Sequence, residues 1–272
     1  MTKIAAGGDP RRTMSLLWRS PTVVEPGRPG PKASLSVDAV VDAAIALADE
    51  ARDGTVSLRA VAGRLGCTAM ALYTYVADRR QLLDLMYDQV HAGLPRPDGD
   101  DWAARVGAWS TAILECYLRH PWVVEVSFAR SVLGPHEQRA LELLLAALAP
   151  ARLDAADTTP IVTALFGLAR STASTIGDAR RSASVSDERA WWTARTAALA
   201  DVAPDFAHRF PHSVALAGGA PGSAEATEAS GWTTSRTDDD APWLEQSARD
   251  AFARAVAMLL EGAAAAAARR AG

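Results

Sequence analysis

The residues with the clearest chemistry lie in a short stretch in which a hydroxyl group is followed by small and apolar side chains. Thr68 can form a hydrogen bond with a base or a phosphate, and Ala69, Met70 and Ala71 after it can meet thymine methyl groups. None of these four side chains can form a two-point hydrogen bond with a base. The pattern therefore predicts contact with base edges without bidentate hydrogen bonds.

Further hydroxyl groups and an arginine flank these residues and are suited to phosphate oxygens. Tyr73, Thr74 and Tyr75 follow directly, and Arg59 precedes them at a distance that lets it reach a base edge or a phosphate. Phosphate contacts set the register and strength of DNA binding, whereas base contacts set the sequence that is read. Two alternatives stay open, because Tyr73 could be half-buried core and Met70 could be an exposed apolar residue without a partner.

The elements that must position these side chains are two short helices joined by a tight turn. Ser57 can cap the first helix, and Gly66 supplies the left-handed residue that ends it. Thr68 can cap the second helix, expected over residues 68–76. The apolar residues recur at helical spacing and form the buried sides of both helices: Leu58, Val61, Ala62, Leu65, Leu72 and Val76. This layout predicts a helix-turn-helix, whose second helix enters the major groove of DNA.

The amino-acid sequence of this stretch also resembles that of a known family. The run Leu-Gly-Cys-Thr-Ala-Met-Ala-Leu-Tyr-Thr-Tyr-Val-Ala-Asp-Arg-Arg-Gln-Leu-Leu resembles the recognition-helix signature of the tetracycline-repressor (TetR) family. The preceding Leu35-Ser36-Val37-Asp38 also fits, so that the match covers roughly residues 35–90. The resemblance implies that Arg79 takes the place of a lysine that grips phosphate at a helix start in relatives. Elsewhere the chain matches only in length, helical character and a His120-Pro121-Trp122 turn.

The resemblance also implies how such a protein functions. Relatives bind a palindromic operator as homodimers, mostly as repressors, and are released by a small molecule. They dimerise through a four-helix bundle made of two late helices from each subunit. The matching candidates here are the small-residue face of residues 160–177 and the apolar face of residues 243–262. A symmetric dimer places two recognition helices about 34 Å apart, which is one turn of DNA.

Composition and charge are compatible with this reading. The formal net charge is −4, but basic residues outnumber acids in 1–35 and 55–83, and acids outnumber basic residues in 200–245. Positive charge therefore gathers where DNA contact is predicted. The sequence contains no run of 18 apolar residues and no apolar segment typical of a signal peptide, and its two cysteines lie far apart. We expect reduced thiols, no membrane span and a cytoplasmic location.

Helical periodicity without strand-like alternation predicts an all-α protein with an N-terminal three-helix helix-turn-helix domain and a C-terminal helical ligand-binding and dimerisation domain. Residues 1–34, rich in proline, glycine and arginine, are expected to be a flexible arm. Residues 35–92 form the expected DNA-binding domain, and residues 98–272 the expected effector-binding and dimerisation domain. Within the latter, residues 217–242 are predicted to be a disordered loop.

The C-terminal part is rich in aromatic residues, which line ligand sites between the helices of bundles. The predicted effector pocket consists of Met86, Trp109, Ile113, Trp122, Phe166, Arg170 and Trp192. The alternative is that each of them is only core. Tetracycline-binding relatives hold a metal ion with a histidine and an acid, but nothing aligns His120, His136 and Glu137 as such a site. We therefore expect neither a metal nor a cofactor.

Two other classes of function are rivals of this reading. An enzyme is disfavoured because the sequence lacks a Gly-x-Ser-x-Gly elbow, a phosphate-binding Gly-x-x-x-x-Gly-Lys loop and a His-Glu-x-x-His motif. A helical interaction module or a ligand-binding protein without DNA-binding activity is the remaining alternative. In the favoured reading, a ligand that displaces residues 86–91 changes the spacing of the two recognition helices.

Overall fold

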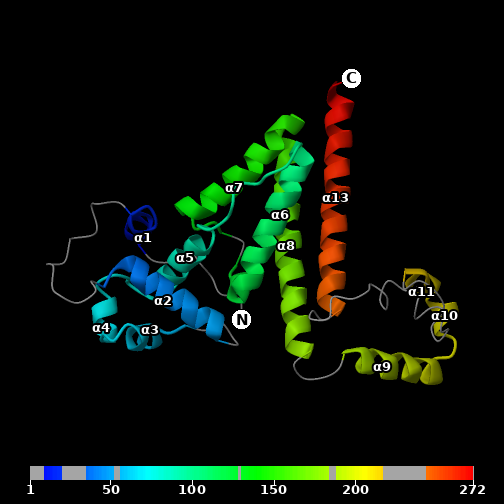
Figure 1. Ribbon diagram of the computed structural model, residues 1–272, viewed down its shortest axis with the longest axis horizontal. Coiled ribbons are helices and arrows are strands. Elements are labelled where there is room, and N and C mark those ends of the chain that lie inside the picture. Colours follow the sequence, from blue (N-terminus) through cyan, green and yellow to red (C-terminus); the bar gives the residue numbers. More distant parts are fainter. Residues whose placement is uncertain are drawn as a thin grey trace. The chain divides into compact units, whose positions relative to one another are not determined.

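The computed structural model describes residues 9–19, 35–51, 56–127, 130–183, 188–216 and 243–271. Its regular elements are helices, which confirms the all-α prediction (Figure 1). The chain forms two compact units, one of residues 1–173 with 256–272 and the other of residues 174–255. Each unit is described separately below.

Four helices of the first unit form the helix-turn-helix head: α2 (Val37–Glu50), α3 (Leu58–Arg64), α4 (Ala69–Leu72) and α5 (Arg79–Val90). Each begins at a side-chain cap, because Ser36, Ser57, Thr68 and Asp78 accept hydrogen bonds from backbone N–H groups three residues ahead. The core between them consists of fully buried apolar side chains: Val40, Val41, Val61, Leu72, Val76 and Leu82. The helix starts predicted at Ser57 and Thr68 are confirmed. The predicted buried faces are confirmed in part, because Leu58 and Leu65 are half-buried and the other four residues are buried.

The recognition helix is shorter than residues 68–76, so this prediction was wrong in its length. Helix α4 ends at Leu72, and residues 73–76 continue as turns, with Thr74 N bonded to Ala71 O and Tyr75 N to Leu72 O. The run Tyr73-Thr74-Tyr75-Val76 is aromatic and β-branched and favours helix weakly. Burial of Leu72 and Val76 still fixes both ends of the turn to the core.

A helix within the segment expected to be a flexible arm is a second correction. Helix α1 spans Pro10–Leu17, with Asp9 as its cap and Pro10 in its first turn. Leu16 and Leu17 are 4% and 2% exposed, and α1 packs against α5. These partners are distant in sequence, which is why local composition did not predict the helix. The rest of the expected arm lies outside the described residues.

The body of the first unit is built from α6 (Trp102–Arg119), the 3-10 helix η1 (Pro121–Glu125), α7 (Pro135–Leu148), the short η2 (Ala149–Ala151) and the first part of α8 (Ala155–Ala183). Asp101 caps α6 through the N–H of Ala104. Apolar stripes of α6, α7 and α8 are fully or almost fully buried. Helix α7 packs against both α6 and α5, so it contacts the last helix of the head.

The second unit contains the end of α8, α9 (Glu188–Val202), α10 (Phe206–Arg209), α11 (Pro211–Leu216) and the start of α13 (Trp243–Ala271). Glu245, only 5% exposed, receives two hydrogen bonds of 2.7 Å from Arg180 and is paired with Arg249. The bonds from Arg180 lower the pKa of this carboxyl. This ion pair joins α8 to α13 within the unit. The predicted disordered loop, residues 217–242, lies outside the described residues.

Among the residues that the structure describes, one helix segment, Leu244–Arg269 of α13, is long and apolar enough to cross a membrane by length and composition alone. Such a segment is weak evidence for a membrane span, since helices that pack in soluble proteins meet the same criteria. Its apolar character comes largely from alanine.

Candidate nucleic-acid interface and effector end

The residues predicted to contact base edges differ in how far they are exposed on the head. Met70 is 75% exposed, and Thr68 is exposed while its hydroxyl accepts the N–H of Ala71 at 3.3 Å. Ala69 and Ala71 are half-buried at the sides of α4. Leu72 is completely buried and fixes the helix to the head. The short helix therefore presents a threonine and a methionine to its surroundings, and its small residues allow close approach.

The hydroxyl-bearing turn after α4 is also accessible. Tyr73 is 45% exposed, Thr74 is exposed and Tyr75 is half-buried. More than half of the Tyr73 surface is covered, so both interpretations of this residue stay open. All three hydroxyl groups belong to a turn held by buried residues on both sides. Their contact with phosphate oxygens stays a prediction.

The arginines of the head differ in how they are engaged. Arg59 is exposed on α3, and Arg79 is exposed at the start of α5, where its Nε donates to the carbonyl oxygen of Val56 at 2.9 Å. That bond orients the guanidinium without neutralising it. Arg64, in contrast, is paired with Glu50 at 2.7 Å. Arg59 and Arg79 thus offer positive charge at the predicted interface, while Arg64 is already compensated.

The turn between α3 and α4 depends on one glycine. Gly66 has φ +66°, its N–H bonds to Gly63 O, and the next N–H, of Cys67, bonds to Ala62 O at 3.0 Å. This is the hydrogen-bond pattern that ends a helix with a left-handed residue. An added Cβ at Gly66 would contact nothing within 4 Å, so only backbone conformation requires glycine there.

We expect Gly66→Ala to lower the free energy of unfolding by about 1–2 kcal/mol, because alanine is strained at positive φ. Chemical denaturation would measure it. Gly63→Ala is the matched control, since Gly63 lies inside α3 with equally open surroundings. That substitution should be neutral or stabilising, and equal destabilisation by both changes would contradict the argument.

Four residues of the predicted effector pocket lie deep in the first unit. Met86, Trp109, Ile113 and Trp122 are at most 3% exposed. The indole Nε1 of Trp109 donates to Ala140 O at 2.9 Å, and its ring meets Phe166 edge-on with 5.0 Å between centroids. The structure therefore brings Trp109 and Phe166 into direct contact between α6, α7 and α8.

The other predicted pocket residues have different surroundings. Arg170 of α8 donates to three carbonyl oxygens of η1 and the residue after it, those of Val123, Val124 and Val126, at 2.6–3.1 Å. Trp192 belongs to the second unit, where its ring contacts that of Trp191. The structure thus does not show the seven residues as one group.

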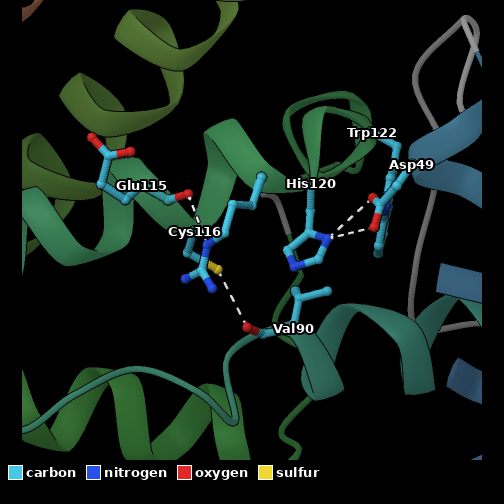
Figure 2. A network of polar contacts seen from close by, with 7 residues as sticks. Asp49, Val90, Glu115, Cys116, His120 and Trp122 are labelled. Atoms are coloured by element: carbon cyan, nitrogen blue, oxygen red, sulfur yellow. Dashed lines mark hydrogen bonds and ion pairs between the residues drawn. The ribbon is translucent and has the colours of Figure 1, made fainter. Parts of the chain in front are cut away.

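A junction between head and body was missed by the sequence reasoning. Asp49, near the end of α2, accepts hydrogen bonds from His120 Nδ1 at 2.9 Å and from Trp122 Nε1 at 2.9 Å (Figure 2). The same view shows Cys116 of α6 pointing its thiol at the carbonyl oxygen of Val90. The His120-Pro121-Trp122 turn was noticeable in the sequence, but its acidic partner is 71 residues away.

A second junction joins α5 to α7. Asp88, 3% exposed, accepts the N–H groups of His136 and Glu137 in the first turn of α7 at 2.9 and 2.8 Å. Burial raises the pKa of Asp88. Gly134 lies so close that an added Cβ would stand 2.2 Å from the Asp88 carboxylate. The glycine therefore permits the side chain of α5 to cap α7.

The end of α5 is packed in a buried aromatic cluster. His91 is 1% exposed, and its ring lies 5.0 Å from that of Tyr87 and 6.1 Å from that of Tyr117. Its Nδ1 is 2.7 Å from Tyr87 O. Burial lowers the pKa of His91 to about 4, and burial also raises the pKa of the nearby Cys116 thiol to about 11. Both groups are therefore uncharged at neutral pH.

A surface groove of about 1070 Å³ lies between residues 96–99, the start of α6 and α7. Its lining includes three arginines, two acids and apolar residues: Arg96, Arg105, Arg139, Asp98, Glu142, Leu143 and Ala147. No ion pair with a carboxylate of the described residues engages these arginines. The lining therefore carries charges of both signs beside apolar side chains, and none of the predicted pocket residues belongs to it.

No group of three or more His, Cys, Asp or Glu side chains in the described part of the chain is arranged to hold a metal ion.

Similarity to known proteins decides the family. The family profile described as "Tetracyclin repressor-like, C-terminal domain" matches residues 94–230, which is half of the chain. The chain belongs to the TetR family. Two curated relatives agree with this: an HTH-type transcriptional repressor, DrrR1, from Streptomyces coeruleorubidus is 39% identical over 153 residues, and an HTH-type transcriptional regulator from Saccharopolyspora erythraea is 35% identical over 130 residues.

The match to these relatives is partial. The alignment with DrrR1 covers 55% of this chain and 55% of the relative, and that with the second regulator covers 46% and 54%. The chain therefore spans about half the length of the curated TetR relatives it matches. The family comprises transcriptional regulators rather than enzymes.

Solved structures share the TetR fold. Apo ActR from Streptomyces coelicolor is 20% identical, with a TM-score of 0.63, covering 88% of this chain and 99% of ActR. ActR in complex with actinorhodin has a TM-score of 0.64 at 20% identity, covering 86% and 98%. At this identity the likeness shows the fold alone, and it confirms the predicted architecture of an N-terminal helix-turn-helix domain and a C-terminal helical domain.

Proposed function

We propose that this TetR-family chain is a ligand-responsive transcriptional repressor that binds a palindromic DNA operator as a homodimer. One observation carries the proposal: Thr68, Met70 and Tyr73 are accessible on a short helix and turn that buried residues hold rigidly in place. Arg59 and Arg79 stand on the elements either side of it. Its relative DrrR1 is named a transcriptional repressor, which supports repression rather than activation.

Contacts in the major groove would combine the predicted residues in two roles. Thr68, Ala69, Met70 and Ala71 approach base edges, where methyl groups of thymine suit the apolar side chains. Tyr73, Thr74, Tyr75 and the two arginines hold phosphates. Because this set contains no side chain capable of bidentate base recognition at the start of α4, we expect shape and methyl contacts to contribute much of the specificity.

The dimer is proposed to form through α8 and α13. Gly167 and Ser171 of α8 are exposed and small, and Met258 of α13 is 65% exposed. Small residues let helices approach closely, and an exposed methionine on a long helix gains from burial. These faces lie within the two candidate segments, residues 160–177 and 243–262.

The effector is proposed to be a small hydrophobic molecule that enters the body of the protein. The structural neighbour ActR has been solved with actinorhodin and with (S)-DNPA. In this chain we assign the contact to six predicted residues of the first unit: Met86, Trp109, Ile113, Trp122, Phe166 and Arg170. The seventh, Trp192, belongs to the second unit and is left out of this assignment. Phe166 packs on Trp109, so a ligand that takes the place of the Phe166 ring against the indole would act on α8, which carries Phe166.

The described contacts provide a route from α8 to the head. Arg170 of α8 holds the carbonyl oxygens of η1, and Trp122 of η1 is bonded to Asp49 of α2. A shift of α8 that pulls Arg170 would therefore act on α2. Because both half-sites of an operator must be met at once, a small rotation of each head lowers the affinity of the dimer.

Selection of DNA from a random pool with the purified protein tests the proposal directly. We expect an inverted repeat whose half-site centres are about one DNA turn apart. Recovery of no enriched sequence would favour the alternative of a helical module without DNA-binding activity.

The phosphate contacts make a separate prediction. We expect Arg59→Gln combined with Arg79→Gln to weaken operator binding and to reduce the slope of log affinity against log salt by about 0.9 for each phosphate that these side chains bind. Fluorescence anisotropy at several salt concentrations would measure both quantities. Arg152→Gln, which removes an exposed charge from the body, is the matched control and should change neither. An unchanged salt slope in the double variant would remove these arginines from the interface.

A further inference from the structure

We propose that α1 is a fixed, DNA-contacting part of the head, which steadies the turn after α4 and adds two arginines to the phosphate contacts. This inference rests on the proposed DNA-binding function. It concerns a helix that the three-helix head predicted from the sequence did not include. The proposal depends on how α1 is anchored and where its arginines lie.

The middle of α1 is anchored in the core of the head. Thr13 is 6% exposed, and its hydroxyl accepts a hydrogen bond of 3.1 Å from Nε2 of Gln81 in α5. Gln81 is itself 1% exposed, and its Oε1 accepts the N–H of Ala77 at 2.8 Å. One buried amide therefore joins α1 to the segment that leads from the recognition turn into α5. Unmaking such a pair would leave a buried polar group without a partner.

The C-terminal end of α1 is held at two further points. Arg19 forms an ion pair with Asp38 in the first turn of α2. The indole Nε1 of Trp18 donates to Leu133 O at 3.0 Å, in the loop before α7. Together with Gln81, these contacts attach α1 to α2, to α5 and to the loop that leads into α7. A helix fixed at three places is a rigid part of the head rather than a tether.

Arg12 of α1 lies beside the predicted interface. The Nη2 atom of Arg12 is 3.5 Å from the carbonyl oxygen of Tyr73, at the end of α4. This places the guanidinium next to the turn that carries the hydroxyl groups of Tyr73 and Thr74. Arg11 is exposed on the same helix. Neither arginine forms an ion pair with any carboxylate that the structure describes.

Phosphate is the chemistry that suits this arrangement. A guanidinium offers several N–H donors in one plane and binds phosphate oxygens with two parallel hydrogen bonds. A neutral carbonyl contact as long as that of Arg12 leaves most of these donors available. The side chains predicted to touch DNA on α4 and its turn are hydroxyl-bearing or apolar, so α1 supplies positive charge where the recognition element has none of its own.

The test compares two double variants by anisotropy with the DNA sequence enriched from the random pool. The first double variant is Arg11→Gln with Arg12→Gln. For each phosphate that these two side chains bind, the double variant should lose about tenfold in DNA affinity. The slope of log affinity against log salt should also fall by about 0.9 for each such phosphate. Arg130→Gln with Arg152→Gln removes two exposed arginines of the body and is the matched control. Equal affinity and slope in the two double variants would overturn the inference.

A second variant separates steadying from direct contact. Trp18→Phe keeps an aromatic ring but loses the bond to Leu133 O. It should weaken binding severalfold while leaving the salt slope unchanged, because no charge is removed. Unchanged affinity would show that this anchor does not steady the turn. Failure of the unmodified protein to bind any DNA would instead overturn the proposed function itself, and circular dichroism would verify that each variant is folded.

Discussion

Replacement of Trp109 by alanine should lower the free energy of unfolding by about 3–5 kcal/mol, the range for a buried tryptophan. The side chain is 1% exposed, touches Phe166 and donates to Ala140 O. Its loss would leave a cavity between α6, α7 and α8 that the surrounding helices fill only partly. Denaturant titration followed by circular dichroism would measure the change. A loss of less than about 1 kcal/mol would mean that the helices repack, or that Trp109 is not core in solution.

Trp109→Phe is the control for this prediction. It keeps an aromatic ring against Phe166 but removes the donor to Ala140 O, so we expect a smaller loss, of about 1–2 kcal/mol. The comparison also bears on the effector site. A ligand that stacks on the indole should stabilise the unmodified protein against heat and stabilise Trp109→Phe less. Equal stabilisation of both would place the ligand away from Trp109, and the arginine-lined groove would become the next site to examine.

Local capping signals were the part of the fold that the sequence predicted best. Ser57 and Thr68 cap the two helices that they were expected to begin, and Ser36, Asp78 and Asp101 cap three further helices in the same way. Each cap involves only residues up to three positions apart, so neighbouring residues determine it. Gly66 could be predicted for the same reason, since its left-handed conformation follows from the tight turn between two helices.

Contacts between distant segments were not predictable in this way. Helix α1 is stabilised by Gln81 and Leu133, which lie 68 and 115 residues from their partners. Asp49 was not singled out, although it joins α2 to η1 through Trp122. In isolation, a short helix such as α1 is marginal, and only its packing makes it persist. Composition described the arm correctly as rich in proline and glycine, but it carries no information about what docks against it.

The aromatic residues of the body show a further limit of prediction from the sequence. Their abundance led to the prediction of an effector pocket, with core packing as the alternative, and Trp109 and Phe166 are in direct contact. Burial and ligand contact favour the same residue types, however, so the sequence alone does not separate core from pocket. The grouping of Trp192 with the other six came from composition, whereas the structure assigns it to the second compact unit.

Acidification should destabilise the protein through His91, and we expect the loss to reach about 3 kcal/mol below pH 4. Burial lowers the pKa of His91 to about 4 from its usual 6.5, with smaller contributions from His120 and His136. Between these two values the unfolded chain binds a proton that the folded chain does not, so stability falls as the pH falls. Each pKa unit corresponds to about 1.4 kcal/mol. Denaturant titrations between pH 4 and 7 would measure the loss.

The carboxyl groups near the α5–α7 junction have the opposite effect on how stability changes with pH. Burial raises the pKa values of Asp88 and Glu137, so the folded chain takes up their protons before the unfolded chain does, and acidification favours folding at these groups. Comparison of the unmodified protein with His91→Leu isolates the histidine, because both proteins keep the carboxyl groups.

The difference in stability between these two proteins should shift in favour of the leucine variant as the pH falls from 7 to 4. Replacement of the exposed His208 by glutamine is the control and should leave the dependence of stability on pH unchanged. A difference that does not vary with pH would show that His91 is accessible to protons in the folded protein, and the buried junction between α5 and α6 would then be more open than its contacts indicate.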